Sequence, residues 1–186
     1  MSQAYTDSTD ADLVALIRAG DRAAISQLVE QWSPAMLRIA RSFVDSAQSA
    51  EDVVQDAWLG MLSGIAGFEG RSSLRGWTFT ILVNRARTRG VREARTVPQP
   101  ELEDTPEASA RTPEGVALSK ETRRQLDRAL SALPERQRQV VTMRDVCGMT
   151  TEEVCAALEI SPANQRVLLH RARAALREAL AGYYRG

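Results

Sequence analysis

The chain has 186 residues, of which 44% are hydrophobic and 26% charged, the balance of an ordinary globular protein. No apolar run is long enough to cross a membrane, and the polar, acidic residues 1–13 do not have the pattern of a signal peptide. We therefore expect a cytoplasmic protein of one large or two small domains. Cys147 and Cys155 are too few for a disulfide framework, and with only His170 to join them we expect no zinc site and no other cofactor.

The net charge is zero, but the charges are unevenly distributed along the chain. Residues 1–69 contain ten acids and four arginines, whereas residues 71–92 contain six arginines and no acid. Residues 162–186 contain five arginines and one glutamate. Separated basic blocks of this kind are typical of surfaces that contact nucleic-acid phosphates. A GC-rich genome explains the excess of arginine over lysine, but it does not explain the clustering.

Helical periodicity predicts four helices in the N-terminal half, and no segment has convincing strand alternation. The expected helices cover residues 12–19, 22–44, 49–64 and about 74–92. Pro34 is placed to restart or kink the second of them. Ser49 and Asp52 have the capping-box spacing that would start the third, and Ser72 or Ser73 is expected to cap the fourth.

The third expected helix carries an acidic face. Asp52, Gln55 and Asp56 fall at i, i+3 and i+4 and form one polar stripe, whereas Val53, Val54, Ala57, Trp58 and Met61 supply the apolar side. The polar stripe is either a solvated surface or a protein-docking surface, and the residues alone do not decide between the two.

The fourth expected helix and the turn before it combine aromatic rings with arginines. Unstacked bases stack on aromatic rings while arginines follow the backbone of a single strand, which would suit Phe68 and Trp77. Phe79 is expected in the core, and Trp77 fits the core as well as base stacking. Arg85, Arg87 and Arg89 are expected to face DNA, because three arginines within five residues cannot all be paired inside a small domain.

Residues 96–115 differ in kind from their surroundings. They contain four of the seven prolines, five acids and one arginine, and they have no apolar period. This composition predicts a flexible linker. Beyond it, helices are expected at about 116–132, 135–146, 151–158 and 162–182.

The last two of these helices have the pattern of a helix-turn-helix. Thr150 and Glu153 have capping-box spacing, residues 159–160 make the turn, and Ser161 can cap a helix that begins with Pro162. One stripe of this second helix is mostly apolar and is expected to face the core: Gln165, Leu169, Ala172, Leu176 and Leu180. Arginine and asparagine on its other faces are the residue types that read guanine and adenine in the major groove.

Three segments together resemble the extracytoplasmic-function (ECF, group IV) sigma factors of bacterial RNA polymerase, in the sigma-70 family. They are AEDVVQDAWLGML (residues 50–62), FEGRSSLRGWTFTILVNRARTRGVRE (68–93) and the stretch from LDRAL to REAL (126–180). The resemblance implies an all-α protein with a sigma-2-like domain at 10–95, the flexible acidic linker at 96–115, and a sigma-4-like helix-turn-helix domain at 116–182.

The resemblance also implies partners and roles. Core RNA polymerase would be bound through its β′ clamp helices and β flap, with Asp52, Gln55, Asp56 and Trp58 at the clamp helices. The loop 68–73 would capture a base flipped from the −10 element, and the linker would thread toward the polymerase active site. Many members of this family are held inactive by an anti-sigma factor, and none is an enzyme. The −10 contacts would be Phe68, Arg71, Ser72, Ser73, Arg75, Trp77, Asn84, Arg85, Arg87 and Arg89. The −35 contacts would be Ser161, Asn164, Arg166, Val167, His170, Arg171 and Arg173.

The chain departs from the family pattern in the helix-turn-helix. Glu159 stands where the family usually has glycine, residues 163–165 replace a Gly-Thr-Val start, and Leu168 replaces a common arginine, so the −35 sequence cannot be read from these residues. Two other classes remain open: a helix-turn-helix regulator that binds duplex DNA alone, and a helical adaptor that binds polymerase but not DNA. The aromatic segment and the acidic helix argue against the first, and the basic blocks argue against the second.

Overall fold

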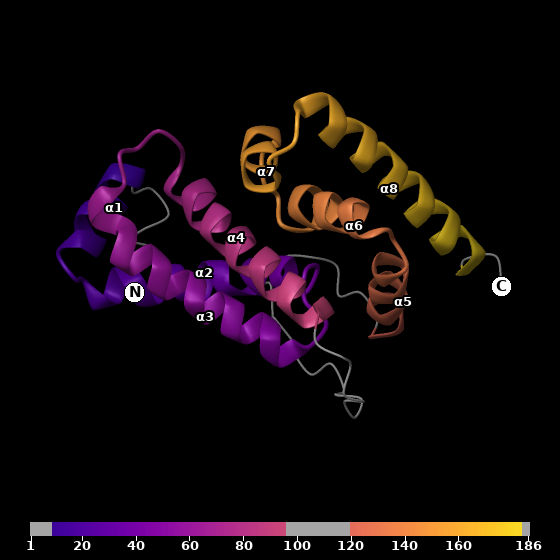
Figure 1. Cartoon of the computed structure of the whole chain (residues 1–186), viewed down its shortest axis with the longest axis horizontal. Coiled ribbons are helices and arrows are strands. Elements are labelled where there is room, and N and C mark those ends of the chain that lie inside the picture. The colour runs from indigo at the N-terminus through magenta and orange to yellow at the C-terminus, as the bar shows by residue number, and fades with distance from the viewer. Residues whose placement is uncertain (1–8, 96–119, 184–186) are drawn as a thin grey trace. The chain divides into compact units, whose positions relative to one another are not determined.

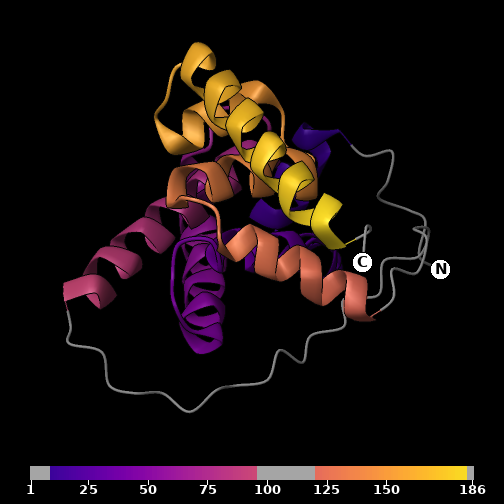
Figure 2. The same ribbon diagram turned by 90° about the vertical axis from the view of Figure 1, so that its right-hand side faces the viewer.

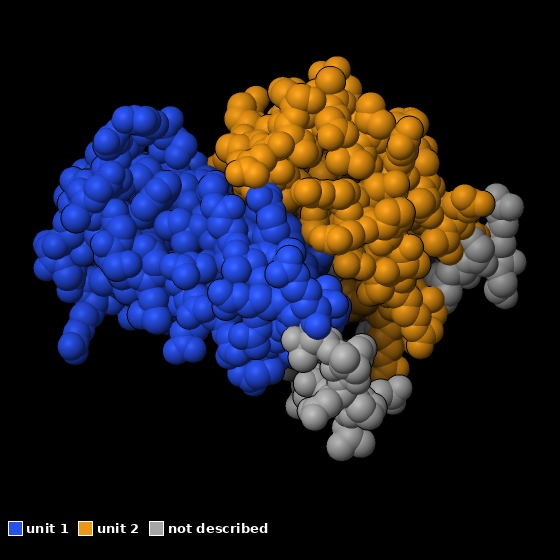
Figure 3. Space-filling model, in the orientation of Figure 1, with its two compact units in different colours: residues 1–100 blue, residues 101–186 orange. Residues whose placement is uncertain are grey.

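The computed structural model describes residues 9–95 and 120–183, and these residues are helical with no strand (Figure 1). The chain forms two compact units, Met1–Pro100 and Glu101–Gly186 (Figure 3). The predicted all-α fold is confirmed. The predicted linker, residues 96–115, lies outside the described residues. None of the described helices combines the length and the apolar character that crossing a membrane requires.

Within residues 9–95, the first unit contains four α-helices and one short 3-10 turn. They are α1 (Asp10–Arg18), α2 (Arg22–Ala40), α3 (Ala47–Gly64), η1 (Ile65–Gly67) and α4 (Leu74–Arg95). The most extensive contact is between α3 and α4, and α2 packs against both. Their apolar stripes meet in a core that includes Met36, Ile39, Met61, Phe79 and Leu82, all fully buried. Burial of this apolar surface is the main source of the unit's stability.

Local capping explains where these helices begin. Thr9 and Asp12 form a capping box on α1, and Asp21 accepts hydrogen bonds from two backbone amides of α2. The expected start of α3 at Ser49 is wrong: the cap is Ser46, whose hydroxyl accepts from the Ser49 amide. Pro34 lies inside α2 without ending it, and that helix stops at residue 40 rather than 44.

The second unit is built around a helix-turn-helix. It comprises α5 (Lys120–Ser131), α6 (Glu135–Val141), the π-helical turn η2 (Thr142–Val146), α7 (Thr151–Leu158) and α8 (Pro162–Tyr183). The expected single helix over 135–146 is therefore an α-helix followed by a π turn. The long helix α8 packs against α5, α6 and α7, and its course beside α5 and α6 can be followed in Figures 1 and 2. The buried side chains include Val140, Met143, Met149, Val154, Leu158, Leu169 and Ala172.

Candidate nucleic-acid and docking interfaces

The acidic stripe of α3 divides into exposed and supporting residues. Gln55 and Asp56 are exposed, whereas Asp52 is half-buried. The Asp52 carboxylate accepts a hydrogen bond from Gln48 Nε2 at 3.0 Å and lies 3.6 Å from Arg89 Nη2. The side chains free to meet a partner are therefore those of Gln55 and Asp56.

An apolar groove lies beside this stripe. Its volume is about 380 Å³, and it is lined by Val29, Leu37, Glu51, Val54, Gln55, Trp58 and Leu59. Leu59 is 59% exposed although it is a large apolar residue. An exposed leucine at the rim of an apolar groove, next to acidic groups, is typical of a protein-binding surface.

Trp58 supports this surface from inside the unit. It is only 8% exposed, its ring stacks on Trp32 with centroids 6.2 Å apart, and its indole N–H donates to Ser33 Oγ at 3.1 Å. Trp58 lines the groove but is almost fully buried, so its contribution to this surface is through packing.

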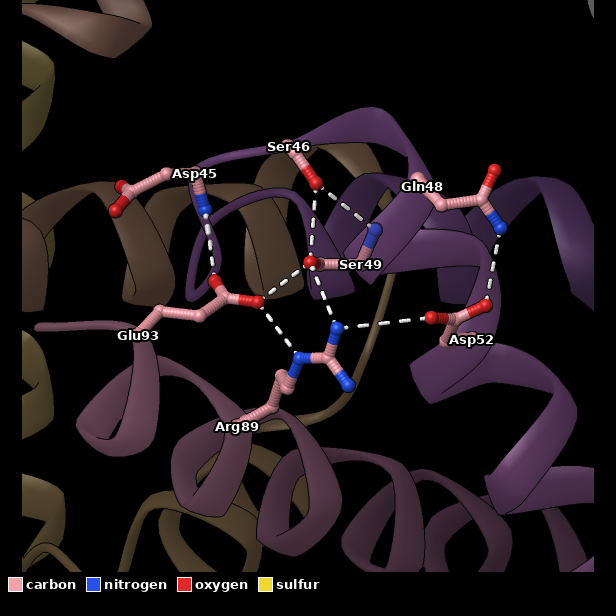
Figure 4. A network of polar contacts seen from close by, with 7 residues as sticks. All are labelled: Asp45, Ser46, Gln48, Ser49, Asp52, Arg89 and Glu93. Atoms are coloured by element: carbon pink, nitrogen blue, oxygen red, sulfur yellow. Dashed lines mark hydrogen bonds and ion pairs between the residues drawn. The ribbon is translucent and has the colours of Figure 1, made fainter. Parts of the chain in front are cut away.

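A polar network joins α3 to α4 (Figure 4). The Glu93 carboxylate accepts from Arg89 Nε at 2.7 Å, from the Ser49 hydroxyl and from the Asp45 amide at 3.4 Å. Arg89 Nη2 also donates to Ser49 Oγ at 3.3 Å. The guanidinium of Arg89, which the sequence places among the DNA-facing arginines, is bound here to an acid one turn along the same helix. The i, i+4 spacing of Arg89 and Glu93 was the available signal, and Glu93 was missed.

This network sets the ionisation of Glu93. Partial burial favours the neutral acid, but hydrogen bonds from Ser49, Arg89 and the Asp45 amide, together with the Arg89 charge, outweigh it. The pKa of Glu93 lies below its ordinary value of 4.5, so the carboxylate stays charged at neutral pH.

Two contacts order the loop between η1 and α4: a ring contact between Phe68 and Trp77, and a helix cap by Ser73. The Phe68 and Trp77 rings lie 5.1 Å apart at a tilt of 48°, and both are half-buried. Ser73 Oγ accepts from the Gly76 amide, so Ser73 rather than Ser72 provides the expected cap. Arg71, Ser72 and Ser73 are exposed, and Arg71 pairs with Glu69.

Further along α4, the expected core residue and the expected DNA contacts differ in exposure. The expected core position of Phe79 is confirmed, since it is fully buried, and the Arg75 guanidinium lies 4.8 Å from its ring centroid. Asn84 and Arg85 are exposed and Arg87 is half-buried. The helix thus presents a polar, basic face outside a closed apolar core.

The helix-turn-helix has the predicted geometry. Thr150 and Glu153 form a capping box, Ser161 Oγ accepts from the Asn164 amide, and Glu159 adopts a left-handed backbone with φ 55° and ψ 47°. The expected core stripe of α8 is confirmed for Gln165, Leu169 and Ala172, which are buried, while Leu176 and Leu180 are half-buried. Seven residues proposed from the resemblance are exposed: Ser161, Asn164, Arg166, Val167, His170, Arg171 and Arg173.

Arg173 is bound by an acid of the same unit. Its Nε and Nη2 donate to the two carboxylate oxygens of Asp145 at 2.8 and 2.7 Å. This two-bond pair ties α8 to the turn before α7 and holds the pKa of Asp145 below its ordinary value. Sequence spacing gave no sign of the pair, because the residues are 28 positions apart.

These features define a class: an all-helical, two-unit protein with a helix-turn-helix in one unit and a basic aromatic helix beside an acidic one in the other. Residues 28–96 match the family model of sigma-70 region 2, and residues 123–176 match that of sigma-70 region 4. The chain belongs to the sigma-70 family, in its ECF group, and it is a sigma factor for promoter-directed transcription initiation. The region 2 match decides against the regulator and the adaptor.

Two sigma factors are similar in sequence to this chain over nearly its whole length. The chain is 29% identical over 186 residues to the ECF RNA polymerase sigma-E factor of Escherichia coli K12, covering 95% of each. It is 27% identical over 184 residues to the RNA polymerase sigma-H factor of Pseudomonas aeruginosa, covering 94% of this chain and 95% of that protein.

Two solved structures share the fold. One is CnrH in complex with the cytosolic domain of CnrY, with 25% identity, a TM-score of 0.66, and coverage of 94% of this chain and 99% of that one. The other is the sigma factor RpoE from Bartonella quintana with the anti-sigma factor NepR, with 26% identity, a TM-score of 0.62, and coverage of 84% and 96%.

Proposed function

We propose that the protein binds core RNA polymerase through α3 and places it on promoters through one DNA contact from each unit. The observation that carries this proposal is that each family match falls within a different compact unit, region 2 within residues 1–100 and region 4 within residues 101–186. The corresponding domains are residues 10–95 and 116–182, joined by a linker at 96–115 that raises the effective concentration of the second contact once the first has formed.

The polymerase contact is the acidic stripe of α3 with its groove. Gln55 and Asp56 would meet the β′ clamp helices directly, with Leu59 at the groove rim. Asp52 and Trp58 would support them from the network and the core. The second unit would reach the β flap.

The −10 contact is the loop 68–73 with the exposed face of α4. The loop would receive a base flipped out of the −10 element, and the opened strand would follow the arginines of the helix. The contacts proposed here are Phe68, Arg71, Ser72, Ser73, Arg75, Trp77, Asn84, Arg85 and Arg87. We leave Arg89 out because Glu93, Ser49 and Asp52 together hold it in the network that joins α4 to α3.

The −35 contact is the outward face of α8 in the major groove. Asn164, Arg166, His170 and Arg171 would reach base edges or phosphates, with Ser161 and Val167 at the start of the helix. Arg173 would position α8 through Asp145. The polymerase would perform the chemistry, in the cytoplasm, and an anti-sigma factor of the kind seen with RpoE would regulate the complex.

The test is transcription in vitro with core polymerase and genomic promoter fragments. Folded protein that directs initiation on no fragment would refute the proposal. For the docking face, Asp56→Arg is a cleaner variant than one at Asp52, because Asp56 is exposed and acts on Arg89 only through its charge, whereas Asp52 lies 3.6 Å from Arg89 Nη2. Reversing this charge should weaken core binding by about tenfold or more, since a like-charge contact costs over 1 kcal/mol.

Glu30→Arg is the matched control for the docking variant. Glu30 is exposed on α2 and does not line the groove, so the same charge change should leave core affinity nearly unaltered. Equal losses in the two variants would indicate a general effect of net charge and would refute the docking face.

A further inference from the structure

Helix α1 is bound to both ends of the loop that precedes α4. At the end of α1, Arg18 Nε donates to the Ile65 carbonyl at 3.1 Å, and Nη2 donates to the carbonyls of Ala66 and Phe68 at 3.2 and 2.9 Å. One guanidinium thus holds three carbonyls of a segment 47 to 50 residues away. Arginine suits this task because its donors are fixed in one plane.

The other end of α1 holds the far end of the loop. Asp10, in the first turn of α1, accepts a hydrogen bond from the Leu74 amide at 2.7 Å. Leu74 is the first residue of α4, so its amide has no partner within that helix. Between these two anchors the loop residues 69–72 are exposed, and Gly70 has φ 72°. The shape of the loop therefore depends on α1.

An open hollow of about 460 Å³ lies between α1 and the loop. On the α1 side it is lined by Asp10, Ala11, Val14, Ala15 and Arg18, and on the loop side by Phe68, Glu69, Gly70, Ser72 and Ser73. Its volume is in the range of small-molecule sites.

The lining suits a neutral ring with polar edges. Alanine, valine and phenylalanine side chains offer apolar contacts, and two hydroxyls and two carboxylates offer hydrogen-bonding groups. The cation on the α1 side, Arg18, is occupied by carbonyls, and carboxylates repel phosphate. An unstacked nucleobase with exocyclic amino donors matches this chemistry, whereas a phosphate does not.

We propose that α1 forms the second wall of the site that receives the flipped −10 base, and that Arg18 is the positioning residue that keeps the loop in its receiving shape. This rests on the proposed role of the loop 68–73 in base capture. Without Arg18 the three carbonyls would turn to solvent and the loop would sample other shapes, so that base discrimination is lost while polymerase docking on α3 is retained.

The test uses holoenzyme reconstituted from core polymerase and the full chain. The probes are versions of a promoter fragment on which the parent holoenzyme initiates, each with one −10 position changed to each of the four bases. Open-complex formation measures discrimination at every position. At the flipped position, the parent should form open complexes with the preferred base roughly tenfold or more better than with the other three, as expected where the protein recognises the base.

In Arg18→Ala holoenzyme this discrimination should fall to about twofold or less, with core affinity unchanged. Arg18→Lys should restore it in part, because one ammonium can still hold a carbonyl. Arg22→Ala, an exposed arginine at the start of α2 that contacts neither loop nor hollow, is the matched control and should behave as the parent.

A second variant tests the α1 wall of the hollow and leaves the hydrogen bonds of Arg18 intact. Ala15 is exposed on α1 and lines the hollow, so Ala15→Phe should fill it, abolish discrimination and leave the thermal midpoint of the protein unchanged. Loss of opening by the same factor for all four bases in Arg18→Ala, or full discrimination in Ala15→Phe, would overturn the proposal. A parent holoenzyme that initiates but discriminates at no −10 position would instead overturn base capture by the loop itself.

Discussion

For the substitution Gly90→Ala, helix propensity and packing predict opposite changes in the free energy of unfolding. Alanine is favoured over glycine within a helix by about 1 kcal/mol, so propensity alone predicts that Gly90→Ala stabilises α4. A Cβ at this position, however, would lie closer than 3.0 Å to the backbone carbonyl oxygen of Phe43, in the turn after α2. A backbone group between two packed helices cannot turn aside as a side-chain end can.

The expected loss follows from two terms. Overpacking of this kind costs about 1–3 kcal/mol, and the displaced turn includes Asp45, whose amide donates to Glu93. A charge-assisted hydrogen bond contributes about 1.5–3 kcal/mol when intact, and this one is long and partly exposed, so we count about 1. After the propensity gain, Gly90→Ala should lower the free energy of unfolding by about 2 kcal/mol.

Tryptophan fluorescence in urea measures this loss in the right unit, because all three tryptophans, Trp32, Trp58 and Trp77, belong to the first unit. The control is Gly67→Ala, where no atom lies within 4 Å of the added Cβ and φ is not positive. That change should be neutral or stabilising by up to about 1 kcal/mol. A Gly90→Ala protein as stable as the parent would refute the close-approach argument.

Two further predictions concern Glu159 and Glu93. Glu159 has a positive φ of 55°, a backbone conformation that costs a non-glycine residue free energy. Glu159→Gly should therefore raise the free energy of unfolding of the second unit by about 1 kcal/mol, measured by far-UV circular dichroism. An unchanged unfolding midpoint would show that the backbone at Glu159 is not strained. The pKa of Glu93 is lower in the folded protein than its ordinary value of 4.5, so its contribution is complete above that pH and is lost as the pH falls through the folded pKa. The stability difference between parent and Glu93→Gln should therefore shrink on acidification, and a constant difference would contradict the ionised network.

The features predictable from sequence are those whose partners are close along the chain. The capping box of Thr150 and Glu153 spans three residues, and the left-handed Glu159 follows from where that helix must end. The buried stripe of α8 follows from helical period alone. These local rules are enough for the fold class and for the helix-turn-helix.

The features that were missed depend on tertiary contacts. Arg89 and Ser49 are 40 residues apart, and Arg18 and Phe68 are 50 apart. The composition of α4 predicts exposed arginines as a group, but it does not identify Arg89 as the one whose guanidinium Glu93 binds. Likewise Ser49 has cap-like spacing, yet the fold places it in the interface with α4 and leaves the capping to Ser46.

The distances within the network decide whether docking on α3 can release Arg89 toward DNA. Arg89 lies 2.7 Å from Glu93 through Nε and 3.6 Å from Asp52 through Nη2. The first is a charge-assisted hydrogen bond, whereas the second is a longer, partly exposed ion pair of the kind that contributes at most about 1 kcal/mol. A partner that draws Asp52 away therefore removes the weaker contact and leaves Arg89 bound to Glu93 and Ser49. We therefore expect Arg89 to fix α4 against α3 in both the free and the docked protein, so that the loop before α4 and the docking stripe keep a constant geometry within the first unit.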